Sequence, residues 1–398
     1  MTLAALNREF WSNEMQRTLF VENTAVFLAG QEASAVLAQD GRKFHKPIIS
    51  KPSTGTYTPY QDITLKNLSS TDELLEVNTF EYSVVEVDDT DVRQNFYDAA
   101  AHAAMSMQKQ LNNRIEQAFL SRVTDANHTI DSGNLGGASG TPIQVSTANI
   151  SALFSAAHTV LDVVDAPMAG RVAVVGAHTA AVMRDLRADR ETPLGDTVLE
   201  NGVVGPWKGW MVVQNNNLPY SARLGIATNP SNGDTVTIAG VTFKFVNALA
   251  AAGDVLIGGN AAASRANLVA AINGAAGAGT TYNEIGQEDR FILSEKRNVT
   301  ATDNAGNNRI DLTGYGDIVV SETLTAAADV WSNQTQNSWF GIRGATDLAV
   351  QPLVSLEVTR KERGFADIVK SLQGYGVKTF ADGARMLCNV VIDASSWV

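Results

Sequence analysis

The stretch from Asn95 to Val123 limits what this chain can fold into, because it predicts an unusually long helix. Its larger apolar residues recur at intervals that place one apolar stripe along a helix, and neither Gly nor Pro interrupts them. These residues are Phe96, Met107, Leu111, Ile115 and Phe119. At ~1.5 Å per residue the helix would be about 44 Å long, whereas most helices have about 11–12 residues. Considered alone, the pattern predicts a long core helix of a large domain.

The composition is that of a globular protein with room for two or three domains. The 398 residues are 44% hydrophobic and carry a formal net charge of −12, which argues against nonspecific binding of nucleic acids. Charges interrupt the apolar N-terminal residues, and no apolar stretch approaches the roughly 20 residues of a membrane span. We therefore expect a soluble protein made in the cytoplasm. Cys388 is the only cysteine, which excludes an intrachain disulfide, and its apolar surroundings predict a buried, inert thiol.

Residues 41 to 70 predict an extended loop or ribbon, which follows a helix expected over residues 8 to 28. Pro47, Pro52 and Pro59 fix the backbone and remove hydrogen-bond donors, and the stretch shows no helical period. The stretch is basic and contains a single acid. Its basic residues are Arg42, Lys43, Lys46, Lys51 and Lys66.

The next stretch, residues 72 to 91, reverses the sign of the charge, since no base balances its acids. Alternating apolar residues within it predict a strand that leads into the long helix. Its candidate contact residues are Glu81, Glu86, Asp88, Asp89 and Asp91. Two interpretations are open: adjacent solvated surfaces, or a basic arm that lies on an acidic patch of another copy. Exposed ion pairs contribute only ~0–1 kcal/mol each, so they would orient such a contact more than supply its affinity.

Residues 147 to 224 predict mixed α/β structure. The expected helices cover residues 148–161 and 178–186, and the expected strands cover residues 171–175 and 209–213. Alternating strands resume near residue 355 and close the chain.

Composition shifts at about residue 225 toward Gly, Ala, Asn and Thr, which predicts a separate small domain, mostly of β structure, inserted in the parent domain. The two-residue turn Ala239-Gly240 lies between alternating apolar residues and predicts a hairpin. A short helix is expected over residues 264–272. Strand-like pieces follow at residues 291–293, 310–312 and 318–320.

The sequence contains no motif for catalysis, metal binding or cofactor binding. The five histidines lack metal-ligand spacing, and the glycine-rich loop at residues 133–140 lacks the Lys-Ser/Thr pair of a phosphate loop. The aspartates at residues 88–91 suit the start of a helix and lack the pattern of a calcium loop. We therefore predict no enzyme and no cofactor, which slightly favours a structural protein.

The order of these parts resembles the major capsid protein of tailed bacteriophages, the family with the Johnson fold. Four stretches carry the resemblance: VNTFEYSVVEVDDTDVRQ, GRVAVVGAHTAAVMRD, GPWKGWMVVQNNNLP and FADIVKSLQGYGVKTF. They resemble coat proteins of short-tailed phages that have an accessory domain inserted in the axial domain. The resemblance implies an α+β fold divided into an N-terminal arm (1–40), an extended loop (41–70), a peripheral domain (71–146) with a spine helix (95–123), the first part of an axial domain (147–224), an inserted β-rich accessory domain (225–330) and a closing axial and peripheral part (331–398).

The resemblance also implies a function. Many copies, as pentamers and hexamers, would assemble into an icosahedral shell that encloses double-stranded DNA without sequence-specific binding. Because the loop region begins within about forty residues, a separate scaffolding protein is expected, together with a portal protein. The implied location is the virion capsid, assembled in the host cytoplasm without a membrane, and we predict no crosslink between subunits. In the family the extended loop reaches over a neighbouring subunit, which fits the reversal of charge between residues 41–70 and 72–91.

Three other interpretations stay open. An encapsulin-like compartment has the same fold but encloses cargo enzymes, and the inserted domain and the acidic strand favour a phage capsid over it. A phage tail or cell-surface binding protein would suit the segment rich in Thr and Asn, but not the long helix. An enzyme with dispersed catalytic residues would be recognised by a substrate pocket in the structure.

Overall fold

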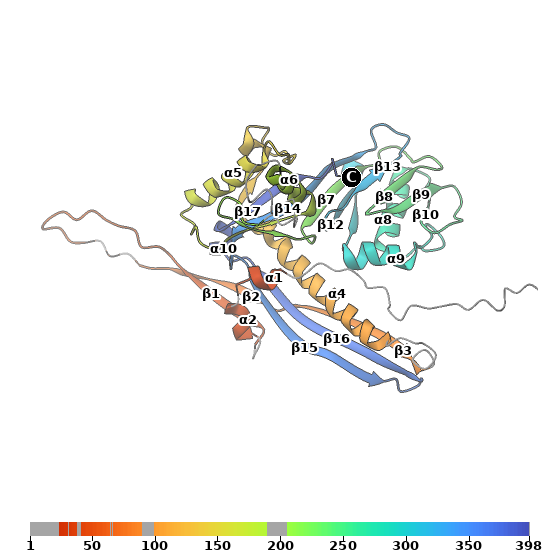
Figure 1. Cartoon of the computed structure of the whole chain (residues 1–398), viewed down its shortest axis with the longest axis horizontal. Helices are drawn as coiled ribbons and strands as arrows, with labels where there is room; N and C mark the ends of the chain where they lie inside the picture. Colours follow the sequence, from red (N-terminus) through yellow and green to blue (C-terminus); the bar gives the residue numbers. More distant parts are fainter. Residues whose placement is uncertain are drawn as a thin grey trace, which may run out of the picture.

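The structure, a computed structural model, describes residues 24–30, 32–37, 41–63, 65, 67–89, 99–188 and 205–397. Figure 1 shows a body of helices and sheets from which one long two-stranded segment projects. The helices are α1 (Ala25–Leu28), α2 (Glu32–Leu37), α4 (Ala99–Ser121), α5 (Ile150–Val163), α6 (Ala177–Ala188), α8 (Ala261–Asn273), α9 (Gln287–Arg290) and α10 (Ala381–Arg385). Within the described ranges, no helix is both long enough and apolar enough to cross a membrane. The helix expected over residues 8–28 lies mostly outside the described residues.

A three-stranded antiparallel sheet and the long helix α4 form one end of the body. The sheet has the order β15 (Asp347–Arg360), β16 (Ala366–Lys378) and β3 (Thr79–Asp88). α4 runs along one face of this sheet (Figure 1). Its apolar stripe is buried from Met107 to Phe119, and Ile115 and Phe119 pack with Tyr375 of β16. The predicted long helix is confirmed from Ala99 to Ser121, and the chain continues from Arg122 to Asp125 as a 3-10 turn. Residues 95–98 of that prediction lie outside the described residues.

An eight-stranded mixed sheet forms the centre of the body. Its strands are β11 (Thr300–Asn304), β12 (Arg309–Tyr315), β7 (Pro219–Gly225), β14 (Trp331–Ile342), β17 (Leu387–Asp393), β4 (His128–Ile130), β5 (Arg171–Val175) and β6 (Met211–Gln214). β14 pairs with β7, β17 and β5 and so joins the branches of the sheet. The ring of Phe340 in β14 lies 5.1 Å from that of Phe154 on α5 and 5.4 Å from that of Trp210. The helices and strands predicted between residues 147 and 224 are confirmed as α5, β5, α6 and β6.

The segment after β7 forms one sheet of its own and extends the central one. Its own four-stranded sheet contains β10 (Asp254–Leu256), β9 (Val241–Val246), β8 (Thr235–Ile238) and β13 (Val320–Glu322). The predicted hairpin is confirmed, because Ile238 pairs with Val241 across a turn in which Ala239 and Gly240 both have positive φ. The short helix predicted next is confirmed as α8.

Strands β11 and β12 of the same segment belong to the central sheet instead. β12 pairs with β7 from Arg309↔Gly225 to Tyr315↔Pro219, and the apolar core of the body continues into the segment. Residues 225–330 therefore share backbone hydrogen bonds and buried surface with the body. Their definition as a separate domain stays a prediction.

The prediction of a strand at residues 291–293 is wrong. The chain is helical there, since α9 runs directly into a π-helical turn, Phe291–Lys296. Periodicity cannot distinguish a short apolar strand from a buried helical segment, so tertiary contacts decide. Gln117 Nε2 on α4 donates a hydrogen bond to the carbonyl oxygen of Lys296 at 3.0 Å, and Arg290 Nη1 donates to the carbonyl oxygen of Ile272 at 2.7 Å. Both contacts favour the helical path.

Cys388 lies in β17 with its side chain fully buried. Burial raises the pKa of its thiol to about 12, because the thiolate would lose its hydration. The prediction of a buried thiol is therefore confirmed.

Candidate subunit-contact surface

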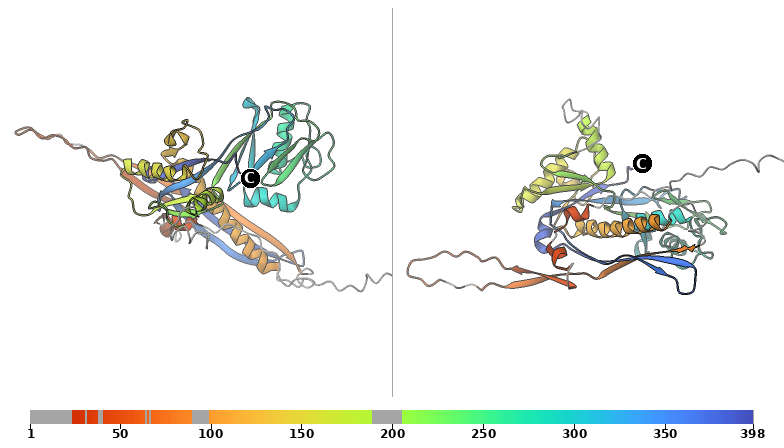
Figure 2. Two further views of the ribbon diagram at one scale, coloured as in Figure 1. Left: turned by 45° about the horizontal axis from the view of Figure 1, so that its top comes forward. Right: turned by 60° about the horizontal axis from the view of Figure 1, so that its bottom comes forward.

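Residues 43–76 form a hairpin that leaves the body, and we call it the arm. β1 (Lys43–Ile49) and β2 (Ser70–Glu76) pair antiparallel from Lys43↔Glu76 to Ile49↔Ser70. All views in Figures 1 and 2 show the arm extending away from the rest of the chain. The extended ribbon predicted around the three prolines is present. The arm therefore offers a surface that its own body does not cover.

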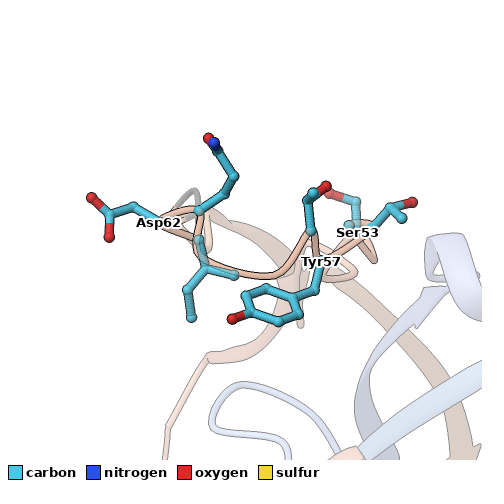
Figure 3. Close-up of a pocket in the computed structure, with 8 residues that line it drawn as sticks. Ser53, Tyr57 and Asp62 are labelled. Carbon is cyan, nitrogen blue, oxygen red and sulfur yellow. The ribbon is translucent and has the colours of Figure 1, made fainter.

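The outer end of the arm exposes large apolar side chains, which we call the arm-tip residues. They are Tyr57, Tyr60, Ile63, Leu65 and Leu68. The loop surrounds a hollow of about 580 Å³ lined by residues between 53 and 63. Figure 3 shows the side chains of these residues on the loop. Apolar groups gathered on an exposed surface mark an interaction site. The arm tip is thus a candidate contact surface.

The three-stranded sheet carries a second exposed apolar surface, on the face away from α4. Side chains alternate along β3, and Phe80, Tyr82 and Val84 are exposed. We call these three the outer-face residues. Glu81 points to the other face, where its Oε1 accepts a hydrogen bond from the Tyr375 hydroxyl at 2.9 Å. Glu81, predicted to contact another copy, therefore has a partner within the chain.

Basic residues predicted to contact another copy also have partners in the chain. Arg42 Nε lies 3.0 Å from Glu76 Oε1 at the root of the arm, and Lys46 Nζ lies 3.1 Å from Asp382 Oδ2. Part of the basic stretch is therefore neutralised by acids of the same molecule. These pairs therefore contribute to the structure at the arm root within one copy and are not free to bind a neighbouring copy.

The acidic residues at the end of β3 also contact basic residues of the same chain. Glu86 Oε1 lies 2.6 Å from Lys361 Nζ, and Asp89 accepts hydrogen bonds from the Arg360 guanidinium. Hydrogen bonds to Asp89 and Asp367 raise the pKa of Arg360 above its ordinary value. Asp88 is the last residue of β3 and lies opposite the first residue of β16, so this acid belongs to a strand end.

The remaining charged candidates stay open to solvent or lie outside the described residues. Lys43 and Lys51 are exposed, and within the described residues neither forms an ion pair. Lys66 and Asp91 lie outside them. The two oppositely charged stretches are thus partly matched inside one chain. Contact between copies through these residues stays a prediction.

A buried polar cluster on α4 was missed by the sequence reasoning. Glu116 is fully buried, and its carboxylate accepts hydrogen bonds from Asn215 Nδ2 at 2.9 Å, Asn217 Nδ2 at 2.7 Å and the Thr24 backbone N–H at 2.5 Å. Several hydrogen bonds are needed to stabilise a buried charge. The only hint in the sequence is the run of asparagines at residues 215–217, a residue type that often turns the chain.

The same side of α4 also holds the π-helical turn of the distant segment. Asn113 Oδ1 accepts from Asn217 Nδ2 at 2.7 Å, and Arg114 Nη2 donates to the carbonyl oxygen of Ser294 at 2.8 Å. α4 therefore connects the start of the described chain, the turn before β7 and the segment beyond β10. In the part of the chain that the structure describes, no group of His, Cys, Asp or Glu is arranged to hold a metal ion.

Comparison with known proteins identifies the fold through structure. No family model and no curated protein matches the chain. A solved structure from Mycobacterium phage Che8 has 13% identity and a TM-score of 0.58, and the match covers 98% of this chain and 97% of that chain. The capsid structure of the cyanophage P-SCSP1u has 12% identity and a TM-score of 0.53, covering 98% and 94%. The head structure of Helicobacter pylori bacteriophage KHP40 has 10% identity and a TM-score of 0.51, covering 98% and 97%.

The chain has a bacteriophage capsid fold. This capsid fold confirms the predicted α+β class and the resemblance that the sequence indicated. The match extends over nearly the whole chain.

Proposed function

We propose that this protein is the subunit of a phage capsid shell, in which many copies self-assemble around double-stranded DNA. The observation that carries the proposal is the arm, which leaves the body and exposes large apolar side chains at its tip. Such side chains gain roughly 25 cal/mol for each Å² of apolar surface that a partner removes from water. A capsid fold with an uncovered apolar arm is suited to holding a second copy.

The outer-face residues of a neighbouring copy are the proposed partner of the arm tip. Phe80, Tyr82 and Val84 form an exposed apolar strip on β3. The arm and β3 leave the arm root in opposite directions (Figures 1 and 2). The tip of one copy therefore points away from its own outer face, and a second copy must supply the contact.

Many contacts of this kind would act together in a closed shell. Each contact alone loses much of its energy to the ordering of the partners, whereas a subunit held by several neighbours dissociates only when all contacts break. Arrangement as pentamers and hexamers with icosahedral symmetry, a separate scaffolding protein and a portal protein are part of the proposal. The proposal also includes a location in the virion, after assembly in the host cytoplasm. The net charge of −12 suits a wall that does not bind DNA tightly.

Negative-stain electron microscopy of the fast-sedimenting material from cells that express the chain tests the proposal. It is done with and without the candidate scaffolding protein. Closed shells, partial shells or tubes are the expected result. Discrete monomers or small oligomers under both conditions would contradict self-assembly.

A triple variant tests the arm separately. Replacing Tyr57, Tyr60 and Ile63 by Ser should abolish shells without lowering the thermal midpoint, because all three side chains are exposed in the single copy. Val319→Ser removes an exposed apolar side chain from another part of the chain and serves as the control. Normal shells from the triple variant would mean that other surfaces hold the subunits together.

A further inference from the structure

Lys46 and Glu73 form a cross-strand pair at the outer limit of the contacts between the arm and the body. The two residues lie directly opposite each other in the hairpin register. Both side chains reach α10: Glu73 Oε2 accepts a hydrogen bond from the Ala381 backbone N–H at 2.9 Å, and Lys46 Nζ lies 3.1 Å from Asp382 Oδ2. From residue 51 to residue 72, every described residue of the arm is exposed. The pair thus lies where the covered root gives way to the free part of the arm.

Further groups around Lys46 reinforce this junction. Its Nζ lies 4.9 Å from the centre of the Phe380 ring and 3.9 Å from Asp347 Oδ2. Phe44, on the same side of β1, packs edge-on against Phe380 with ring centres 6.5 Å apart. The ammonium group of Lys46 is therefore held by an aromatic ring and by two carboxylates from different elements.

Asp347 shows why the junction needs a cation. Its side chain is almost completely buried, and desolvation raises the pKa of its carboxyl. Lys46 opposes that shift, whereas the negative charges of Asp382 and Glu32 add to it. Lys378 lies opposite Asp347 in the sheet register. Removal of Lys46 would leave three acids from β15, α10 and α2 without the cation that the arm supplies.

We propose that Lys46 and Glu73 form a clasp on α10 that fixes the angle of the arm in a single copy. α10 leads into β17 of the central sheet, so the clasp ties the arm to a buried part of the body. A closed clasp presents the arm in one orientation before a neighbour arrives, which reduces the entropy lost on contact. An open clasp leaves the arm to move about the small apolar core at its root, which contains Leu75, Val77 and Phe380.

Distances between two spin labels within one copy test the clasp. The labels are attached to Tyr57→Cys at the arm tip and Val163→Cys on α5, both at exposed positions, while the buried Cys388 stays unlabelled. Labelled protein is diluted into unlabelled protein, so that only distances within a copy are measured. Lys46→Met should make the distance distribution roughly twofold broader, because the arm could then turn about the contacts that remain at its root. Asp382→Asn removes the negative charge from this contact at an exposed side chain. It should also broaden the distribution, but by less than Lys46→Met, since Asp347 and Phe380 still contact the ammonium group.

Lys43→Met is the matched control, since it removes the same charge from the same strand at an exposed position. The distribution should stay narrow in this control. Equal broadening in Lys43→Met, or no broadening in Lys46→Met, would overturn the clasp. The Lys46→Met/Asp382→Asn double variant should be no broader than Lys46→Met alone. If Lys46→Met does not fold, the result with Asp382→Asn decides.

The clasp and the shell proposal can fail independently. The spin-label distances report one copy, whereas electron microscopy reports whether copies assemble. A narrow distribution that Lys46→Met broadens would support the clasp even if the chain formed no shells. Shells from a variant whose distribution never changed would support assembly and refute the clasp.

Discussion

Asn217 Nδ2 donates a hydrogen bond to Glu116 Oε2 at 2.7 Å and so joins α4 to the turn before β7, 101 residues later in the chain. Asn215 Nδ2 donates to Glu116 Oε1 at 2.9 Å. Both oxygens of this buried carboxylate therefore act as acceptors. An amide in its place could accept through one atom only, and its NH₂ group would face a donor.

Glu116→Gln should consequently lower the free energy of unfolding by about 1–3 kcal/mol, the usual cost of leaving a buried polar group unpaired. Urea denaturation followed by circular dichroism measures the change. Glu288→Gln alters an exposed carboxylate on α9 and should leave the midpoint unchanged. Equal midpoints for the two variants would show that the donors around Glu116 rearrange without cost.

Gly376 of β16 allows the root of the arm to pass close to the sheet. A Cβ atom at this position would lie 2.3 Å from the carbonyl oxygen of Glu76 and 3.2 Å from the Cα atom of Val77. Gly376→Ala should force the backbone apart and destabilise the protein by about 1–3 kcal/mol, as overpacking usually does. Thermal unfolding tests this, with Gly55→Ala as the control because a Cβ there meets nothing within 4 Å. A Gly376→Ala protein as stable as the control would contradict close packing at the root.

Tyr220 should make the protein sensitive to alkaline pH. Burial raises the pKa of its phenol above the ordinary value of about 10, and among the described residues its hydroxyl has no hydrogen-bond partner. The unfolded chain therefore loses this proton first. The contribution of Tyr220 to the free energy of unfolding is therefore complete below the pKa of this residue in the unfolded chain. It is lost as the pH rises from that value toward the higher pKa of Tyr220 in the folded protein.

Tyr220→Phe should accordingly reduce the loss of stability between roughly pH 9 and 11, and it should be neutral or stabilising at pH 7. Urea midpoints across this pH range measure the effect. Tyr57→Phe, at an exposed position, should leave the slope as it is. An unchanged slope in Tyr220→Phe would assign the alkaline loss to other groups.

Charge reversal in the arm should separate contacts between copies from contacts within one copy. Lys43→Glu and Lys51→Glu change exposed residues, so they should weaken assembly and leave the thermal midpoint of the single copy unchanged. Arg42→Glu would also break the pair with Glu76 and should disturb the arm root. Sedimentation of shells and thermal unfolding are the two measurements. Normal shells from Lys43→Glu/Lys51→Glu would refute a role for this charge between copies.

Sequence periodicity predicted the parts of the fold that depend on neighbouring residues. The apolar stripe of α4 and the Ala239-Gly240 hairpin were found in this way, because their spacing alone specifies the structure. It failed at residues 291–293, where side chains of α4 hold a helical turn. The Glu116 cluster was invisible for a similar reason, since its donors come from distant parts of the chain.

The candidate contact surface was predictable only in part. The sequence shows the prolines and the basic charge of the arm, but it does not show which of these charges form ion pairs within the same chain. Lys46 reaches an acid that follows 336 residues later, and no local pattern signals such a pair. The alternation of side chains in the sequence is enough to predict that one face of β3 is exposed. That β3 and the arm extend in opposite directions is visible only in the folded structure.

The turn between β8 and β9 offers a place to attach a foreign peptide. Gly240 is exposed, and the turn lies outside the β7–β12 pairing that the body shares with this segment. Extra residues between Ala239 and Gly240 would lengthen a solvent-facing turn, the kind of site at which insertions are best tolerated. A shell built from such subunits would carry one peptide on each copy, at spacings set by its symmetry.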